Sequence, residues 1–163
     1  MAFGGIRYLV GLALVLFLSL SVAKAAEIKT YADEATTREV VTALDRLGKL
    51  VRQKDLKVLD EFTDHAILVG SDKGEMADGR DALRAFFSTF FAQPLTAGWD
   101  WTSIRIDASN TIAWVFAEGD LVVQSGRSTE RSPYRLSAVL ERRDGRWLWR
   151  EFNGSEPKKL TRE

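Results

Sequence analysis

The chain has 163 residues, of which 45% are hydrophobic and 28% charged, a length and composition typical of one globular domain rather than a disordered chain. The formal net charge is +0 and no Lys/Arg-rich stretch stands out, so nucleic acid is not an expected partner. Cysteine is absent, which excludes disulfides, zinc–thiolate sites, c-type haem and thiol catalysis.

The first 25 residues have the layout of a secretory signal peptide. Arg7 precedes an apolar run from Tyr8 to Val22, and Ala23-Lys24-Ala25 supplies the small residues that a signal peptidase needs. The run is 15 residues long, shorter than the roughly 20 that a spanning helix needs. We therefore expect cleavage after Ala25 and export to the periplasm or the cell exterior, without membrane attachment afterwards. An uncleaved membrane anchor is the alternative.

The next part of the chain predicts helices. Residues 26–35 are interpreted as a lead-in without regular structure. Apolar residues then recur at helical spacing behind Thr36 or Thr37, either of which can cap a helix. Pro94 ends the last helical pattern. The predicted elements are helices over 37–53, from Asp55 onwards and over 80–92, a strand over 65–69, and a polar loop over 71–79.

The second half of the chain changes to the two-residue period of strands. Asp144-Gly145 is a typical two-residue hairpin turn, and short turns join the other segments. Helices followed by an antiparallel meander indicate an α+β domain with helices packed on one sheet face. Four segments rich in aromatic and β-branched residues are the predicted strands: 99–107, 111–124, 132–143 and 146–153.

The first of these strands contains a break in its alternation. Trp99 and Trp101 share one face, whereas Ile104 and Ile106 would fall on the other. We therefore predict a β-bulge near Thr102-Ser103, which would bend the sheet around the helices and leave a concavity. Burial of both faces of the strand is the alternative.

Short strings at six places share their order and spacing with a known family. They are Val69-Gly70-Ser71-Asp72, Gly79-Arg80-Asp81-Ala82, Ala113-Trp114-Val115-Phe116-Ala117-Glu118-Gly119, Tyr134-Arg135-Leu136, Arg143-Asp144-Gly145-Arg146-Trp147 and Phe152-Asn153-Gly154-Ser155-Glu156-Pro157. Over residues 36–157 they resemble the SnoaL-like branch of the nuclear transport factor 2-like superfamily. The expected organisation is a signal peptide (1–25), a lead-in (26–35), this domain (36–157) and a tail (158–163).

The resemblance implies a fold with three N-terminal helices packed on a strongly curved, mostly antiparallel sheet, which forms a cone with a pocket. It also implies a homodimer formed through the sheet. Members of the superfamily include ketosteroid isomerases, polyketide cyclases, dehydratases and limonene epoxide hydrolases, and many others only bind ligands or partners. The fold therefore does not decide the function.

One family feature differs in this chain. In many relatives the last strand ends in His-x-Ser, with the His in the pocket. Here Asn153 occupies that position and Ser155 is kept. Because an amide cannot shuttle protons near neutral pH, this difference weakens the argument, drawn from the relatives, that the domain is an acid–base catalyst. Strand alternation from Asn153 predicts that Glu151 and Trp149 face the pocket too.

The central strand supplies a second candidate carboxylate. Glu118 shares a face with Trp114 and Phe116, and this bulky set is the one expected to point inward. Glu118 and Glu151 would then meet in an aromatic-walled cavity, where burial and repulsion suit a general base or acid. The alternative is that Glu118 is solvated or paired with Arg135 or Arg150. The candidate ligand-binding residues are Trp99, Trp114, Phe116, Tyr134, Trp149 and Asn153.

Two classes of function follow from these residues. The first is a non-catalytic exported domain that binds a small apolar or amphipathic ligand, or a partner. The second is a cofactor-independent isomerase, cyclase or lyase in which Glu118 or Glu151 is the base and Tyr134 or Asn153 holds an oxyanion. We expect no cofactor and no metal ion, because the acidic residues from Asp72 to Asp81 do not match a calcium loop.

Overall fold

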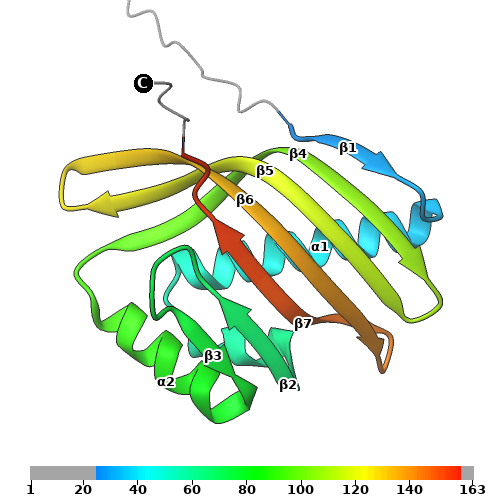
Figure 1. Cartoon of the computed structure of the whole chain (residues 1–163), viewed down its shortest axis with the longest axis horizontal. Coiled ribbons are helices and arrows are strands. Elements are labelled where there is room, and N and C mark those ends of the chain that lie inside the picture. Colours follow the sequence, from blue (N-terminus) through cyan, green and yellow to red (C-terminus); the bar gives the residue numbers. More distant parts are fainter. Residues whose placement is uncertain (1–24, 159–163) are drawn as a thin grey trace, which may run out of the picture.

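A computed structural model of the chain describes residues 25–158, and the predicted signal peptide, apart from Ala25, lies outside them. The described residues form a seven-stranded sheet with helices against it (Figure 1). None of their helices is long and apolar enough to span a membrane. The elements are β1 (Glu27–Thr30), α1 (Glu34–Arg52), η1 (Leu56–Glu61), β2 (Phe62–Val69), β3 (Met76–Asp78), α2 (Gly79–Ala92), β4 (Thr96–Ser109), β5 (Ile112–Ser125), β6 (Ser128–Arg143) and β7 (Arg146–Ser155).

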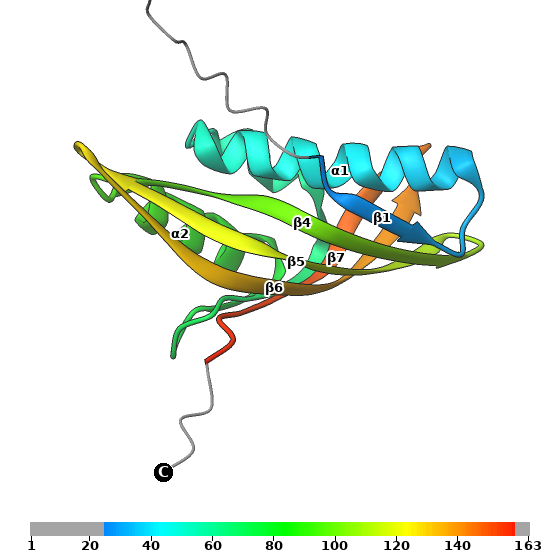
Figure 2. The same cartoon turned by 90° about the horizontal axis from the view of Figure 1, so that it is seen from above.

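The strand order in the sheet is β1-β4-β5-β6-β7-β2-β3. Only the β1–β4 and β2–β7 pairs are parallel, so the expected α+β class with a mostly antiparallel sheet is confirmed. Figure 2 shows the sheet curving around α1, which lies along its concave side. The helices do not form one N-terminal block, because β1 precedes α1 and two strands separate η1 from α2.

The helix α1 begins earlier than its apolar pattern predicts. Its N-cap is Asp33, whose carboxylate accepts a hydrogen bond from the Thr36 backbone N–H at 2.8 Å. The threonines expected to cap the helix therefore lie inside its first turn. A stripe of small and branched residues, including Ala43, Leu44 and Leu47, is buried against the sheet. The predicted short helix after Asp55 is confirmed as the 3₁₀ helix η1, and Asp55 accepts from Lys57 N–H at 2.9 Å.

The lead-in expected over 26–35 is wrong in part, because β1 lies within it and pairs with β4 through Ile28 and Ile104. A four-residue edge strand leaves too short a pattern to recognise in sequence. The same holds for the three residues of β3, which complete the sheet beside β2. Such pairings are decided by the tertiary fold.

The predicted β-bulge is confirmed. Trp101 pairs with Gly119 and Ser103 with Glu118, so Thr102 is the extra residue of β4. Trp99 and Trp101 consequently stack at 6.0 Å on the same side as the buried Ile104. Gly119 is required opposite the bulge, because a Cβ there would lie 2.2 Å from the Asp100 carbonyl oxygen.

A second bulge, in β7, was not expected. Val139 pairs with Glu151 but Leu140 pairs with Trp149, so Arg150 is the extra residue. Trp149 is buried, whereas Glu151 points to the outer face of the sheet beside Val139. The expectation that Trp149 and Glu151 share a face is therefore wrong.

The orientation expected for β5 is also wrong. Ala113, Val115 and Ala117 are buried on the helix side of the strand, whereas Trp114 and Phe116 are 48% and 41% exposed on the outer side. The residues on the buried face of β5 are smaller than Trp114 and Phe116, which lie on the opposite face.

Candidate functional site

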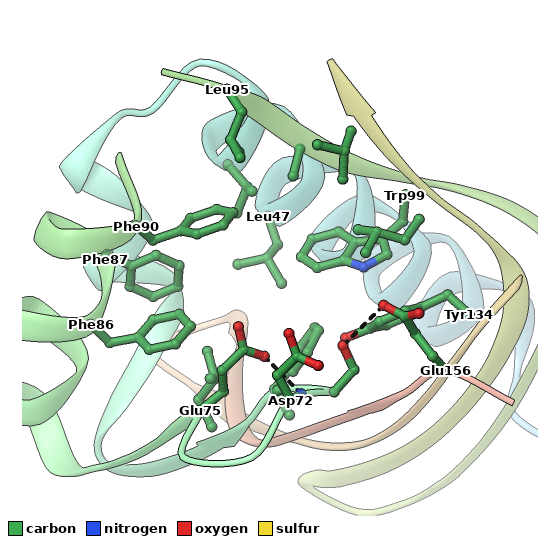
Figure 3. Close-up of a pocket in the computed structure, with 18 of the residues that line it drawn as sticks. Leu47, Asp72, Glu75, Phe86, Phe87, Phe90, Leu95, Trp99, Tyr134 and Glu156 are labelled. Atoms are coloured by element: carbon green, nitrogen blue, oxygen red, sulfur yellow. Dashed lines mark hydrogen bonds between the residues drawn. The ribbon is translucent and has the colours of Figure 1, made fainter. Parts of the chain in front are cut away.

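A cavity of about 170 Å³ lies on the helix side of the sheet. Figure 3 shows it between α2, the loop that joins β2 to β3, and the curved strands β4, β5 and β6. The cavity exists because the bulge in β4 bends the sheet away from α2, while short residues such as Ala97 line the strand beyond it.

Most of the cavity wall is apolar. Phe86, Phe87 and Phe90 project from consecutive turns of α2, with the rings of Phe86 and Phe87 edge to face at 5.3 Å. Trp99 and Leu121 face them from the sheet. The aromatic side of α2 contributes both to the core and to the cavity, since Phe87 is buried while Phe86 and Phe90 remain half-exposed at the cavity.

The polar groups gather at one end of the cavity. The β2–β3 loop contributes Ser71, Asp72 and Glu75, and the segment after β7 contributes Glu156. Glu75 Oε2 accepts a hydrogen bond from the Asp72 backbone N–H at 3.1 Å, and Ser71 Oγ donates to Glu156 Oε1 at 3.3 Å. Gly70 makes this loop possible, because a Cβ at that position would lie 2.1 Å from Glu75 Oε2.

Tyr134 stands between the apolar wall and the polar end. Its side chain is 4% exposed and lines the cavity. Burial raises the pKa of its hydroxyl far above the usual value, and the negative charges of Glu75 and, to a smaller extent, Glu156 raise it further. The indole N–H of Trp99 acts on this pKa in the opposite direction, but it is not in hydrogen-bond geometry with any acceptor in residues 25–158. Gly154 leaves room for the hydroxyl, since a Cβ there would lie 1.8 Å from it.

Only part of the predicted site comes together in this cavity. Trp99 and Tyr134 line it. Trp149 is 1% exposed and packs behind the lining residues Phe62 and Phe152, at ring distances of 6.4 and 5.7 Å. It therefore supports the cavity without lining it.

The other predicted site residues lie on the outer face of the sheet. Glu118 is paired there with Arg135 at 2.9 Å, the arrangement considered as the alternative for this residue. Glu151 lies with Trp114 and Phe116 in a shallow groove of about 210 Å³. Asn153 is exposed on β7, in register with Ser137. The two candidate carboxylates consequently do not meet in a cavity.

The sequence interpretation missed the acidic end of the cavity. Asp72 and Glu75 were considered only as metal ligands, and Glu156 only as part of a family string. Within residues 25–158 no group of three or more such side chains is arranged to hold a metal ion. The signal available in the sequence was Gly70 before an acidic loop, since a glycine at a strand end permits a close approach of another side chain.

These features define a class of α+β domains in which helices and a curved sheet enclose an apolar cavity with a polar end. The chain belongs to the SnoaL-like domain family, whose sequence profile matches residues 40–156. A comparison with curated proteins finds no match.

Three solved structures illustrate the similarity of fold. An NTF2-like protein of unknown function from Pseudomonas putida has 14% identity and a TM-score of 0.68, over 78% of this chain and 91% of its own. A proposed dehydratase of the NTF2-like family from Streptomyces avermitilis has 11% identity and a TM-score of 0.69, over 78% and 100%. A proposed scytalone dehydratase from Novosphingobium aromaticivorans has 13% identity and a TM-score of 0.68, over 78% and 90%. At these identities the similarity extends to the fold alone.

Proposed function

We propose that the protein is an exported pocket domain that binds a small apolar or amphipathic ligand in the cavity of Figure 3. The observation that carries the proposal is the lining, in which aromatic and aliphatic side chains wall a space whose polar groups gather at one end. Ligand sites have this character, because apolar walls supply affinity and a few polar groups fix orientation.

Filling the cavity tests the proposal. Val123 lines the cavity from β5, and the neighbouring Val122 does not. We expect Val123→Trp to weaken binding of neutral 2-phenylethanol at least about tenfold, because the indole occupies the space of the probe. Val122→Trp, the matched control on the other face, should bind as the parent does. Calorimetric titration measures both. Equal affinity of the two variants would place the binding site elsewhere.

A second candidate function is a cofactor-independent isomerase, cyclase or lyase. The observation that favours it is Tyr134, whose raised pKa keeps the hydroxyl protonated as a hydrogen-bond donor beside carboxylates. The base in this reading is Glu75 rather than Glu118 or Glu151, since Glu75 lines the cavity. Exchange of the α-protons of small ketones in D₂O, followed by NMR, tests it. Exchange that survives Glu75→Gln would exclude that role.

We also propose a homodimer formed through the outer face of the sheet. One row of residues crosses four strand pairs of the sheet: Phe116, Ser137, Asn153, Val69 and Met76. Phe116 and Met76 in that row are 41% and 63% exposed. Exposed apolar rows of this kind mark interfaces. Val115 does not contribute to this face, because it is buried on the other side.

Light scattering on residues 26–163 should give about twice the monomer mass. Phe116→Glu should shift the protein to monomer, because it replaces an exposed apolar side chain of this face with a charge. Leu56→Glu is the control, since Leu56 is similarly exposed, at 44%, but belongs to η1. A parent protein that stays monomeric at high concentration would contradict the proposal.

The proposal of export rests on the N-terminal sequence. Cleavage after Ala25 would leave β1, which begins at Glu27, intact. Expressed with its own leader in a Gram-negative host, the protein should be recovered from the periplasm with Ala26, or a residue next to it, as its N-terminus. Mass spectrometry of the intact protein checks this. Soluble cytoplasmic protein that retains Met1 would contradict it.

A further inference from the structure

The charge at the polar end of the cavity is of one sign. The three charged side chains that line the cavity are Asp72, Glu75 and Glu156, and no Lys or Arg lines it. The whole chain, in contrast, has equal numbers of acidic and basic residues. A hollow with walls of low polarity and charges of one sign focuses their field on whatever enters it. Glu75 is half-buried in this hollow, whereas Asp72 and Glu156 are exposed.

Several acidic residues of this protein are paired with arginine, but these three are not. Glu61, Glu118 and Asp120, for example, all lie within 3.1 Å of an arginine nitrogen. Within the described part of the chain, no ion pair involves the cavity carboxylates, whose hydrogen bonds come from one backbone N–H and one serine hydroxyl. Their negative charge is therefore available to a ligand.

Tyr134 provides an independent observation. Its side chain is more than nine-tenths buried, and it lines the cavity. A hydroxyl oxygen can accept a hydrogen bond from a donor that enters. The direction of its pKa shift, which Glu75 and Glu156 increase, agrees with a negative potential at this point.

The apolar wall suits the same kind of ligand. The rings of Trp99, Phe86 and Phe90 line the same cavity as the carboxylates. An aromatic ring attracts a cation to its face through its quadrupole. The wall therefore accommodates an apolar frame and does not repel a positive group.

We infer that the cavity selects an organic cation: a primary or quaternary ammonium group on a small apolar frame, with the positive group among Asp72, Glu75 and Glu156 and beside the Tyr134 hydroxyl. The inference rests on the proposed ligand-binding function and specifies the chemistry of the ligand. A carboxylate or phosphate ligand is disfavoured, because three negative side chains would repel it.

Calorimetric titration with three probes on one frame tests the inference: 2-phenylethylammonium, neutral 2-phenylethanol and anionic 3-phenylpropanoate. At low salt the ammonium should bind at least about tenfold more tightly than the alcohol, and the anion should bind more weakly than the alcohol. Raising the ionic strength to about 0.5 M should reduce the advantage of the ammonium, because salt screens charges that are partly exposed.

Matched variants assign the effect to particular residues. Glu75→Gln combined with Glu156→Gln should remove most of the preference for the ammonium, measured as the ratio of its affinity to that of the alcohol in the same variant. Glutamine keeps the shape of the side chain and, at position 75, the acceptor for the Asp72 N–H. Glu118→Gln alters a residue on the outer face and should leave the preference for the ammonium unchanged. Should the double variant fail to fold by circular dichroism, each single variant should show a smaller loss of the same preference.

The outcomes separate the two levels of the proposal. If the alcohol or the anion binds as tightly as the ammonium, the cation inference is overturned and the apolar pocket stands. A preference for the ammonium that persists in the double variant, or in both single variants if the double variant does not fold, also overturns it. If no probe binds the parent protein, the proposed function fails together with the inference.

Discussion

Trp149→Ala is expected to lower the free energy of unfolding by about 3–5 kcal/mol, the range for large aromatic truncations in a core. Trp149 is 1% exposed and packs on Phe62 and Phe152, which line the cavity. Removal of the indole therefore leaves a void that the curved sheet cannot close. It should also weaken ligand binding, because both neighbouring rings lose the side chain that positions them.

Urea denaturation followed by circular dichroism measures the loss of stability. Tyr31→Ala is the control, because Tyr31 is 80% exposed and the change should stay within about 0.5 kcal/mol. Trp149→Phe should lower the free energy of unfolding much less than the alanine variant does. It keeps an aromatic ring and removes an indole N–H that has no acceptor in residues 25–158. A Trp149→Ala protein as stable as the parent would contradict the core position of this side chain.

The order of the larger elements could be predicted from the sequence because their signals are local. The apolar stripe of α1 and the turn at Asp144-Gly145 need no knowledge of the rest of the chain. The bulge in β4 could also be predicted, since four large apolar residues, Trp99 and Trp101 with Ile104 and Ile106, cannot all be buried on one face without an extra residue.

The bulge in β7 carries no such signal. The residues around it, Arg150 and Glu151, are charged, and a charged side chain fits either face of a half-buried strand in the sequence pattern. The inner face of β5 was predicted wrongly for a related reason. Bulk alone does not reveal that Ala113 and Ala117 lie on the buried face of the strand, because burial depends on how the elements pack in three dimensions.

The acidic end of the cavity could not be predicted because it is assembled over a long sequence distance. Asp72 follows β2 and Glu156 follows β7, and these strands lie side by side through the parallel pair of Val69 and Asn153. Nothing in the hairpin and helix signals of the sequence indicates that pairing. Tyr134, one of the candidate residues, lines the cavity, since alternation from the buried Leu136 places it on the inner face of β6.

The second large effect is expected at Glu61, which joins α1 to the β6–β7 hairpin. Its side chain is 5% exposed and lies 2.7 Å from Arg46 Nη2 and 2.9 Å from Arg146 Nη2. The two arginine side chains are 36% and 50% exposed. Burial of the carboxylate is therefore compensated by two charge-assisted contacts, while the arginines keep much of their hydration.

Glu61→Gln should lower the free energy of unfolding by about 2–3 kcal/mol, below the roughly 3–5 kcal/mol for breaking a fully buried pair, because both arginines can turn to water. Glu118→Gln is the matched control, since Glu118 also pairs with an arginine at 2.9 Å but is 46% exposed. The free energy of unfolding should fall by no more than about 1 kcal/mol in Glu118→Gln, and this difference should vanish at high salt. Urea melts of the two variants at low and high salt give the comparison. Losses of equal size, or a Glu61 effect that disappears with salt, would show that burial does not strengthen this ion-pair network.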